Sequence, residues 1–327
     1  MQKRRKKKNN ELVWEGRSIF WPRQYDGRLP GGDSNLWMCA QDAGNELWVH
    51  FHRLERISQS NIVEPLQLEN CSDELRELLV ESLPYKQYRE NLGGAITNFS
   101  KIIAQSLVIE GRIDFEIKIG WNQKIDPWRM EKVVLKFIPN ESLTYLGSQV
   151  FQVIPPGAES DGSPGRIIRL DPKRIVTFRT PLQWRRTLAR IRNGLPLIGR
   201  SERSWMNWMV RHVRNEDINT VKRTYNIQIA RLTAPIGWNA RSLFRDEIAN
   251  FHWICRELQW ERFCIELRDD ILRTLGDAFQ RIGQLRGETP RLVWQNLPTV
   301  EQVEEGLNQV MSGKTRFDSV LKPFRLE

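Results

Sequence analysis

The sequence has few of the residues, and none of the short motifs, that commonly carry catalysis. Four histidines are spread through 327 residues. There is no Gly-x-Ser-x-Gly nucleophile motif, no Gly-x4-Gly-Lys-Ser/Thr phosphate loop and no Gly-x-Gly-x-x-Gly fingerprint. Nucleophilic catalysis needs a base held beside a serine or cysteine, and nothing in the sequence pattern marks such a pair. We therefore expect a protein that is not an enzyme and that needs no cofactor.

Cysteine is also scarce, and long apolar runs are absent. Cys39, Cys71, Cys255 and Cys264 have neither the paired spacing of a zinc site nor the density of a disulfide framework. No signal peptide precedes them, so we interpret them as buried thiols in a reducing compartment. No stretch of about 18 consecutive apolar residues occurs, which predicts that no segment spans a membrane.

Positive charge, by contrast, is concentrated in two segments. The formal net charge is +10, and six of the positive residues form the run KRRKKK near the N-terminus. The segment 179–214 has nine arginines against one acidic residue, Glu202, and it also contains three tryptophans. Outside these segments the chain is mildly acidic. This asymmetry favours a polyanionic partner, most simply nucleic acid, although Arg and Trp are also favoured at protein–protein interfaces.

The candidate contact residues are therefore the cations of these two segments. On a helix, Arg185, Arg186 and Arg190 would lie close together, facing a phosphate backbone or the acidic residues of a neighbouring subunit. The predicted nucleic-acid-binding or subunit-interface residues are Lys3, Arg4, Arg5, Lys6, Lys7, Lys8, Arg179, Arg185, Arg186, Arg190, Arg192, Arg200, Arg203, Arg211 and Arg214. The predicted interface or core anchors are Trp184, Trp205 and Trp208.

The N-terminal part of the chain predicts a basic arm followed by strands. Residues 1–10 form a flexible arm that either binds nucleic acid or only solubilises the chain, and residues 11–70 form a β-rich segment. Within it, His50 and His52 alternate with apolar residues, as on a strand with two faces. A zinc site at these histidines is one interpretation. Solvent-facing strand histidines explain the pattern as well, and we expect no metal site.

Residues 71–179 predict a wing-like α+β domain, with a helix packed on a small, mostly antiparallel sheet. A short helix opens at Ser72, and a longer one covers about 88–109. The period then changes, and Asp114, Glu116 and Lys118 alternate with apolar residues. We interpret these three as the solvent face of a half-buried strand, although the acids could also hold Mg²⁺ in a metal-dependent nuclease. Further strands are expected at 131–139, 148–156, 166–170 and 173–179.

Residues 180–284 predict a helical stem-like or crown-like region, so the fold class is α+β with a mainly helical C-terminal half. A helix over 182–193 should stop at Asn193-Gly194, before Pro196, and others cover 201–213 and 216–232. The longest helix runs from Asn239 to Ile282 and would reach about 65 Å. Such a rod is more typical of an oligomer, channel or scaffold than of a small globular domain. Residues 285–327 form a C-terminal helix, near 299–312, and a tail.

Two stretches carry a family resemblance. The helix end IIAQSLVIEGRIDFEIKI runs through Gly111 into a strand, and RLDPKRIVTFR ends the sheet and leads into helices. Over about residues 88–180 this order resembles the wing of the portal proteins of tailed bacteriophages. The resemblance implies a portal-like, non-enzymatic ring of identical subunits that conducts double-stranded DNA, with the helices of 180–282 lining or buttressing the channel. It also implies docking of other capsid, packaging or tail-connector proteins.

On this resemblance the protein would belong to the virion, and to the host cytoplasm during assembly. Two other functions remain open from the sequence. The first is a monomeric or dimeric nucleic-acid-binding protein of replication or of a mobile element, which is not an enzyme. The second is the metal-dependent nuclease at Asp114 and Glu116. We expect no membrane partner.

Overall fold

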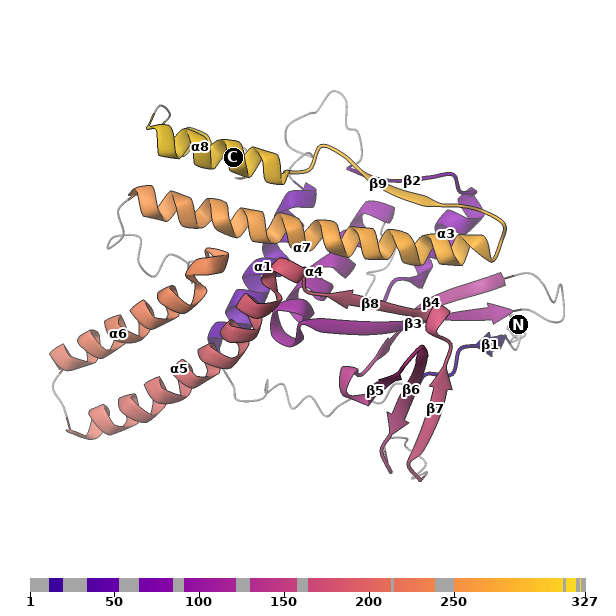
Figure 1. The fold of residues 1–327 in the computed structure, drawn as a ribbon, viewed down its shortest axis with the longest axis horizontal. Coiled ribbons are helices and arrows are strands. Elements are labelled where there is room, and N and C mark those ends of the chain that lie inside the picture. Colours follow the sequence, from indigo (N-terminus) through magenta and orange to yellow (C-terminus); the bar gives the residue numbers. More distant parts are fainter. Residues whose placement is uncertain are drawn as a thin grey trace, which may run out of the picture.

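The computed structural model of the chain describes residues 12–19, 34–52, 65–84, 91–121, 130–157, 164–212, 215–238, 250–313, 316–321 and 324. The side chains of residues 202–219, 221, 222, 317 and 318 lie outside this description. The fold is α+β: helices pack against small antiparallel sheets, the C-terminal half is mainly helical, and one helix is much longer than the others (Figure 1).

A helix occupies most of the described N-terminal segment. α1 runs from Ser34 to His52, so the prediction of a β-rich segment with a strand at His50 and His52 is wrong. Cys39, Leu47 and His50 are buried at helical spacing, and α1 packs against α4. The apolar spacing typical of a helix extends along α1, whereas the alternation typical of a strand covers only its last few residues. The helical pattern therefore determines the structure of this segment.

Two helices with defined ends follow. α3 (Asp73–Ser82) begins after Ser72, whose side chain accepts a hydrogen bond from a backbone N–H of the first turn. α4 (Leu92–Glu110) ends at Gly111, which has a φ of 80° and provides a left-handed C-cap. By length and composition alone, α4 could cross a membrane, but half of its apolar window is buried. Its packing against α1 and β3 accounts for the apolar composition.

β3 (Arg112–Trp121) is the central strand of a four-stranded antiparallel sheet. β4 (Met130–Ile138) pairs along one edge of β3. β8 (Ile175–Arg179) and β1 (Val13–Glu15) share the other edge, β8 beside the first half of β3 and β1 beside its end. Residues of both faces of β3 are buried, so the expectation of a half-buried strand is wrong.

Aromatic rings join α4 to this sheet. The ring centroid of Phe99 in α4 lies 5.7 Å from that of Phe115 in β3 and 5.6 Å from that of Phe178 in β8. Phe137 of β4 meets Phe115 nearly edge to face. The predicted arrangement, a helix packed on a small antiparallel sheet, is confirmed.

Two smaller antiparallel sheets complete the β structure. β5 (Leu143–Leu146), β6 (Gln149–Ile154) and β7 (Arg166–Leu170) form one, and β5 has no counterpart in the sequence prediction. β2 (Leu66–Glu69) pairs with β9 (Arg291–Trp294), which brings together segments more than 200 residues apart in the sequence.

The segment after the sheet forms one continuous helix. α5 runs from Arg185 to His212 with Pro196 inside it, so the predicted stop at Asn193-Gly194 is wrong. A Cβ atom at Gly194 would lie 2.6 Å from a methyl carbon of Leu232 in α6 (Asn215–Thr233). Gly194 therefore permits close packing of α5 against α6. Proline's fixed φ is compatible with the helix, and the proline removes one hydrogen bond without ending it.

The longest helix lies across the body of the molecule. α7 is described from Asn250 to Gln284, a length of about 52 Å, and residues 239–249 of the predicted helix are outside the described residues. α8 (Val300–Ser312) lies alongside α7, and α9 (Phe317–Leu321) contacts both helices. The predicted helix near 299–312, with its Thr299 cap and Gly313 stop, is confirmed. α5 and α6 form a hairpin that projects from this body (Figure 1).

Candidate nucleic-acid or subunit interface

One face of the α5 segment carries exposed arginines. From the short turn before α5 to the middle of the helix, exposed residues recur every three or four positions, which places them on one side. We call this set the arginine stripe: Leu182, Arg186, Arg190, Asn193, Leu197 and Arg200. Leu182 and Leu197 are 75% and 60% exposed, so the stripe combines fixed positive charge with apolar surface.

The opposite face of α5 is anchored in the core. Leu188 and Ile191 are buried there. Trp184, at the start of the segment, is only 8% exposed, and its ring meets Phe263 of α7 edge to face at 5.5 Å between centroids. Its indole N–H donates to the carboxylate of Glu266. The structure thus places Trp184 among the core side chains, with the arginine stripe on the other side of the helix.

Other predicted arginines of this segment make local contacts. Arg192 donates to the backbone carbonyl of Leu107 at the end of α4, and burial lowers the pKa of its guanidinium. The Nε–H of Arg185 donates to the carbonyl of Thr180 at 2.9 Å. Arg179 is exposed at the end of β8. Arg192 therefore fixes α5 to α4 and does not belong to the stripe.

The stripe arginines have no acidic neighbour among the described residues. Arg186, Arg190 and Arg200 form no ion pair with any side chain in the described part of the chain. An exposed arginine elsewhere is paired: a guanidinium nitrogen of Arg273 in α7 lies 2.9 Å from a carboxylate oxygen of Asp270. The positive charge of the stripe is thus not neutralised by an ion pair within the described part of the chain.

The remaining predicted contact residues cannot be assigned to this surface. Those whose placement or side chain lies outside the described residues are Lys3, Arg4, Arg5, Lys6, Lys7, Lys8, Arg203, Arg211, Arg214, Trp205 and Trp208.

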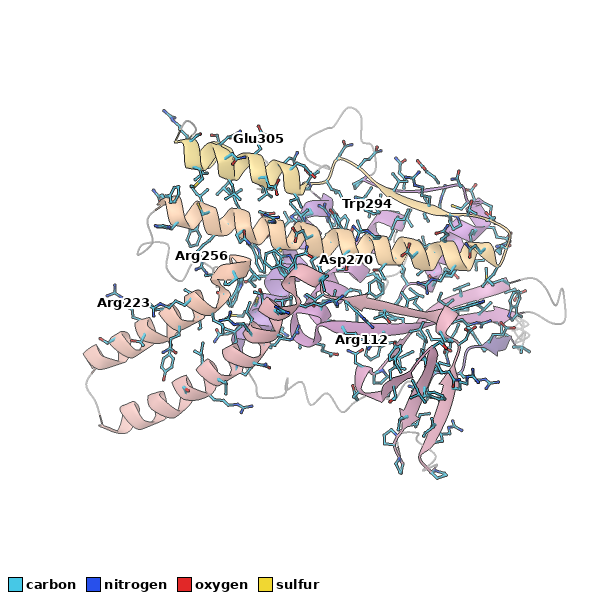
Figure 2. All side chains as sticks on the ribbon, viewed as in Figure 1. Arg112, Arg223, Arg256, Asp270, Trp294 and Glu305 are labelled. Atoms are coloured by element: carbon cyan, nitrogen blue, oxygen red, sulfur yellow. The ribbon has the colours of Figure 1, made fainter. Side chains whose placement is uncertain are left out.

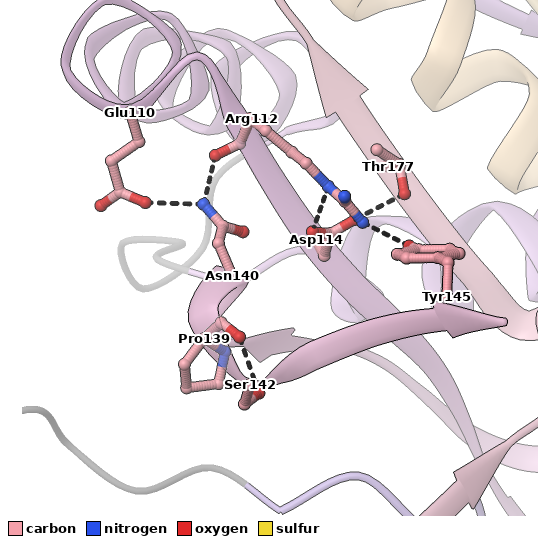
Figure 3. A network of polar contacts seen from close by, with 8 residues as sticks. All are labelled: Glu110, Arg112, Asp114, Pro139, Asn140, Ser142, Tyr145 and Thr177. Carbon is pink, nitrogen blue, oxygen red and sulfur yellow. Dashed lines mark hydrogen bonds and ion pairs between the residues drawn. The ribbon is translucent and has the colours of Figure 1, made fainter. Parts of the chain in front are cut away.

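Asp114, the first acid of the alternative nuclease site, lies in a buried polar network. Its carboxylate receives two contacts from the guanidinium of Arg112, at 2.6 and 2.9 Å, and a hydrogen bond from the hydroxyl of Thr177 (Figure 3). Arg112 in turn donates to the hydroxyl of Tyr145 and lies over its ring. The interpretation of Asp114 as a solvent-facing residue is wrong, because the residue is fully buried.

Glu116, the second acid, is also buried and holds the N-terminal segment against β3. Its two carboxylate oxygens accept the backbone N–H groups of Arg17 at 3.1 Å and Ser18 at 2.8 Å. Lys118 donates to the carbonyl of Ser18. These contacts give Asp114, Glu116 and Lys118 structural roles, and the solvent-face interpretation of Glu116 is wrong as well.

A second group of ionisable side chains gathers between α1 and α7. Glu46 and His50 lie one turn apart on α1, and Glu261 projects from α7. The Nε2 atom of His50 lies 3.0 Å from a carboxylate oxygen of Glu261, and one ligand-type atom from each residue lies within 4.8 Å of the others. Burial, followed by the neighbouring Glu261 carboxylate, raises the pKa of Glu46 to about 8.

This cluster is the feature that the sequence prediction missed. The signal was present, because Glu46 and His50 have the four-residue spacing that puts two side chains on one helix face. Assigning the segment to a strand paired His50 with His52 instead. In the structure His52 is on the surface, stacked on the ring of Trp48 at 4.0 Å, whereas His50 is buried.

Comparisons of the chain with models of protein families, with curated proteins and with solved structures give no match. The evidence for function is therefore the arrangement of its own residues.

Proposed function

We propose that the chain is a structural, portal-like subunit that assembles into a ring and holds or conducts double-stranded DNA. The observation that carries this proposal is the arginine stripe, which runs from the turn before α5 to the middle of that helix, before the helix continues into the projecting α5–α6 hairpin. Its guanidinium groups are exposed and lack acidic partners among the described residues, while the other face of α5 is packed in the core. The stripe is therefore an exposed, positively charged surface on a helix whose opposite face is fixed in the core.

A phosphate backbone is the partner that suits this surface. Arginine is always charged at neutral pH and donates several hydrogen bonds in a fixed geometry, which matches phosphate oxygens. Contacts of this kind carry no base information, so they serve a protein that must accept any DNA sequence.

Self-assembly is the second part of the proposal. The order in which α4 leads into β3 and β8 leads into α5 supports it, because this order underlies the resemblance to portal wings. The exposed Leu182 and Leu197 add apolar surface that a neighbouring copy could cover. Capsid, packaging and tail-connector proteins would be the further partners.

Charge reversal of the stripe tests the DNA contact. We expect that Arg186→Glu, Arg190→Glu and Arg200→Glu together abolish retention of double-stranded DNA at low salt. Binding of the parent should weaken steeply with salt, because each phosphate contact releases counterions. The measurement is fluorescence anisotropy with a random-sequence duplex over a salt series.

A matched control separates the stripe from net charge. Arg169, Arg291 and Arg316 are exposed on other elements, and changing all three to Glu alters the net charge by the same amount. We expect this variant to retain most of the DNA binding. Equal loss of binding in the two triple variants would contradict the proposal, because the stripe would then have no special role.

A further inference from the structure

The group formed by Glu46, His50 and Glu261 has the composition of a metal site. Its ligand-type atoms come from two helices that cross in the core, and they converge to within 4.8 Å of one another. In a tetrahedral zinc site with bond lengths near 2.1 Å, neighbouring ligand atoms are about 3.4 Å apart. Small side-chain adjustments would bring the three atoms to that separation.

We propose that Glu46, His50 and Glu261 bind one divalent transition-metal ion of the zinc type, and that the ion ties α1 to α7. One imidazole and two carboxylates form a ligand set that zinc accepts in proteins. A hard cation such as Mg²⁺ prefers oxygen ligands and usually keeps several waters, so the buried imidazole disfavours it.

The surroundings favour a bound cation. Glu257 lies one turn before Glu261 on α7 and acts electrostatically on Glu46, and Asp42 lies one turn before Glu46 on α1. The nearby cation, Arg268, is already engaged by Asp269 at 2.7 Å and by the carbonyl of Pro298. The cluster is therefore rich in carboxylates, whose mutual repulsion a divalent ion would relieve.

Without a metal, burial and the neighbouring carboxylate of Glu261 favour the protonated form of Glu46, because they raise its pKa to about 8. Metal binding would displace this proton, so affinity should rise with pH and binding should release protons to the buffer. A site of this kind would have a structural role, independent of DNA binding by the arginine stripe.

The experiment uses the full chain after treatment with a chelator. Calorimetry with Zn²⁺ measures stoichiometry and affinity, and repeating it in buffers of different ionisation enthalpy measures proton release. Visible absorption of bound Co²⁺ reports an imidazole and carboxylate environment. We expect one ion per chain and, at a hundredfold excess of Zn²⁺ over Kd, a rise in melting temperature of about 5 °C. Mg²⁺ should have no such effect.

Three variants distinguish a metal-binding site from a cluster of polar side chains that binds no metal. Glu46→Gln keeps the shape of the neutral side chain, so it should fold and yet bind Zn²⁺ at least about tenfold more weakly. His50→Gln should show the same loss, whereas His52→Gln, which changes the partly exposed histidine of the same helix, should bind like the parent. No Zn²⁺ binding by the folded parent would overturn the proposal. So would equal affinity in the parent and Glu46→Gln, or equal losses in the two histidine variants.

Discussion

At the scale of single residues, the polar groups inside the fold determine how it responds to solution conditions. Asp114 and Glu116 are buried with cationic or backbone donors that stabilise their charge. Glu46 is different, because it is buried and the charged group of Glu261 near it is another carboxylate. The pKa of Glu46 is therefore raised to about 8, and its proton is retained in the folded state.

This difference predicts a pH dependence of stability. The folded state keeps a proton on Glu46 that the unfolded chain releases above its ordinary pKa of 4.5. The free energy of unfolding should therefore fall as the pH rises from 5 to 8, by on the order of 1 kcal/mol per pH unit from this group. Glu46→Gln cannot titrate, so it should remove this contribution. Urea unfolding at pH 5, 6, 7 and 8, with a chelator present, measures the effect.

The control for this prediction is Glu305→Gln. Glu305 is exposed on the outer face of α8, away from the α1–α7 cluster (Figure 2). This variant should follow the parent at every pH. An identical pH slope for the parent and Glu46→Gln would show that the Glu46 proton does not contribute to stability.

Residue roles were only partly predictable from the sequence. The exposed positions of Arg186, Arg190 and Arg200 follow from arginine's preference for surfaces and from helical spacing. The buried state of Asp114 and Glu116 does not follow, because it depends on Thr177 of the neighbouring strand β8 and on the N-terminal segment that packs on β3. Alternation along a strand indicates two faces, but it does not show whether a second layer covers the polar one.

At the scale of elements, long periodic segments were predicted well and segments with conflicting signals were not. α4 and α8 agree with their apolar spacing and have defined caps, and α6 agrees closely with its predicted range. α5 was divided in the prediction because Gly194 and Pro196 are usual stop signals. In the fold, Gly194 leaves room for the side chain of Leu232 in α6. A sequence pattern alone does not distinguish a glycine that permits close packing from a glycine that ends a helix.

The turn between α6 and α7 depends on a glycine for both conformation and space. Gly237 has a φ of 76°, and a Cβ atom there would lie 2.2 Å from the backbone carbonyl oxygen of Arg256. The Arg256 side chain also donates to the carbonyl of Trp238 at 2.7 Å, between α6 and α7 (Figure 2). We expect Gly237→Ala to lower the free energy of unfolding by more than about 3 kcal/mol, because backbone atoms cannot move aside cheaply.

Gly147 provides the comparison for this change. It also has a positive φ, 59°, but a Cβ atom added there would have no neighbouring atom within 4 Å. Gly147→Ala should therefore cost only about 1 kcal/mol, the conformational part of the effect. Denaturant unfolding measures both variants, and similar losses in the two would contradict the argument from close contact.

At the scale of the whole molecule, α7 joins parts of the chain that are far apart in sequence. It contacts α1, α4, β8, β9 and α8. One continuous hydrophobic core extends from Leu36 to Leu297 and includes residues of the sheet, of α5 and of α7. The body is thus held together across the wing-like and helical regions, while the α5–α6 hairpin projects from it (Figure 1).

The proposed ring can be tested at this scale. We expect the purified protein at micromolar concentration to form a high-order oligomer in light scattering and a ring with a central hole in negative-stain images. A stable monomer would contradict the ring and favour the monomeric nucleic-acid-binding alternative. The variant with Arg186, Arg190 and Arg200 changed to Glu distinguishes DNA from a neighbouring copy as the partner of the stripe. If the arginines face DNA, its ring should persist without DNA binding, and if they contact a neighbouring copy, its ring should dissociate.

Pro196 has a mechanical consequence. Proline has no N–H, so the carbonyl of Arg192 one turn earlier lacks its usual helical donor. The Arg192 side chain fixes the first half of α5 to the end of α4, whereas the second half belongs to the projecting hairpin. The missing hydrogen bond lies near the point where the anchored half of α5 leads into the hairpin, so a bend there would displace the second half of α5 and α6 relative to the body.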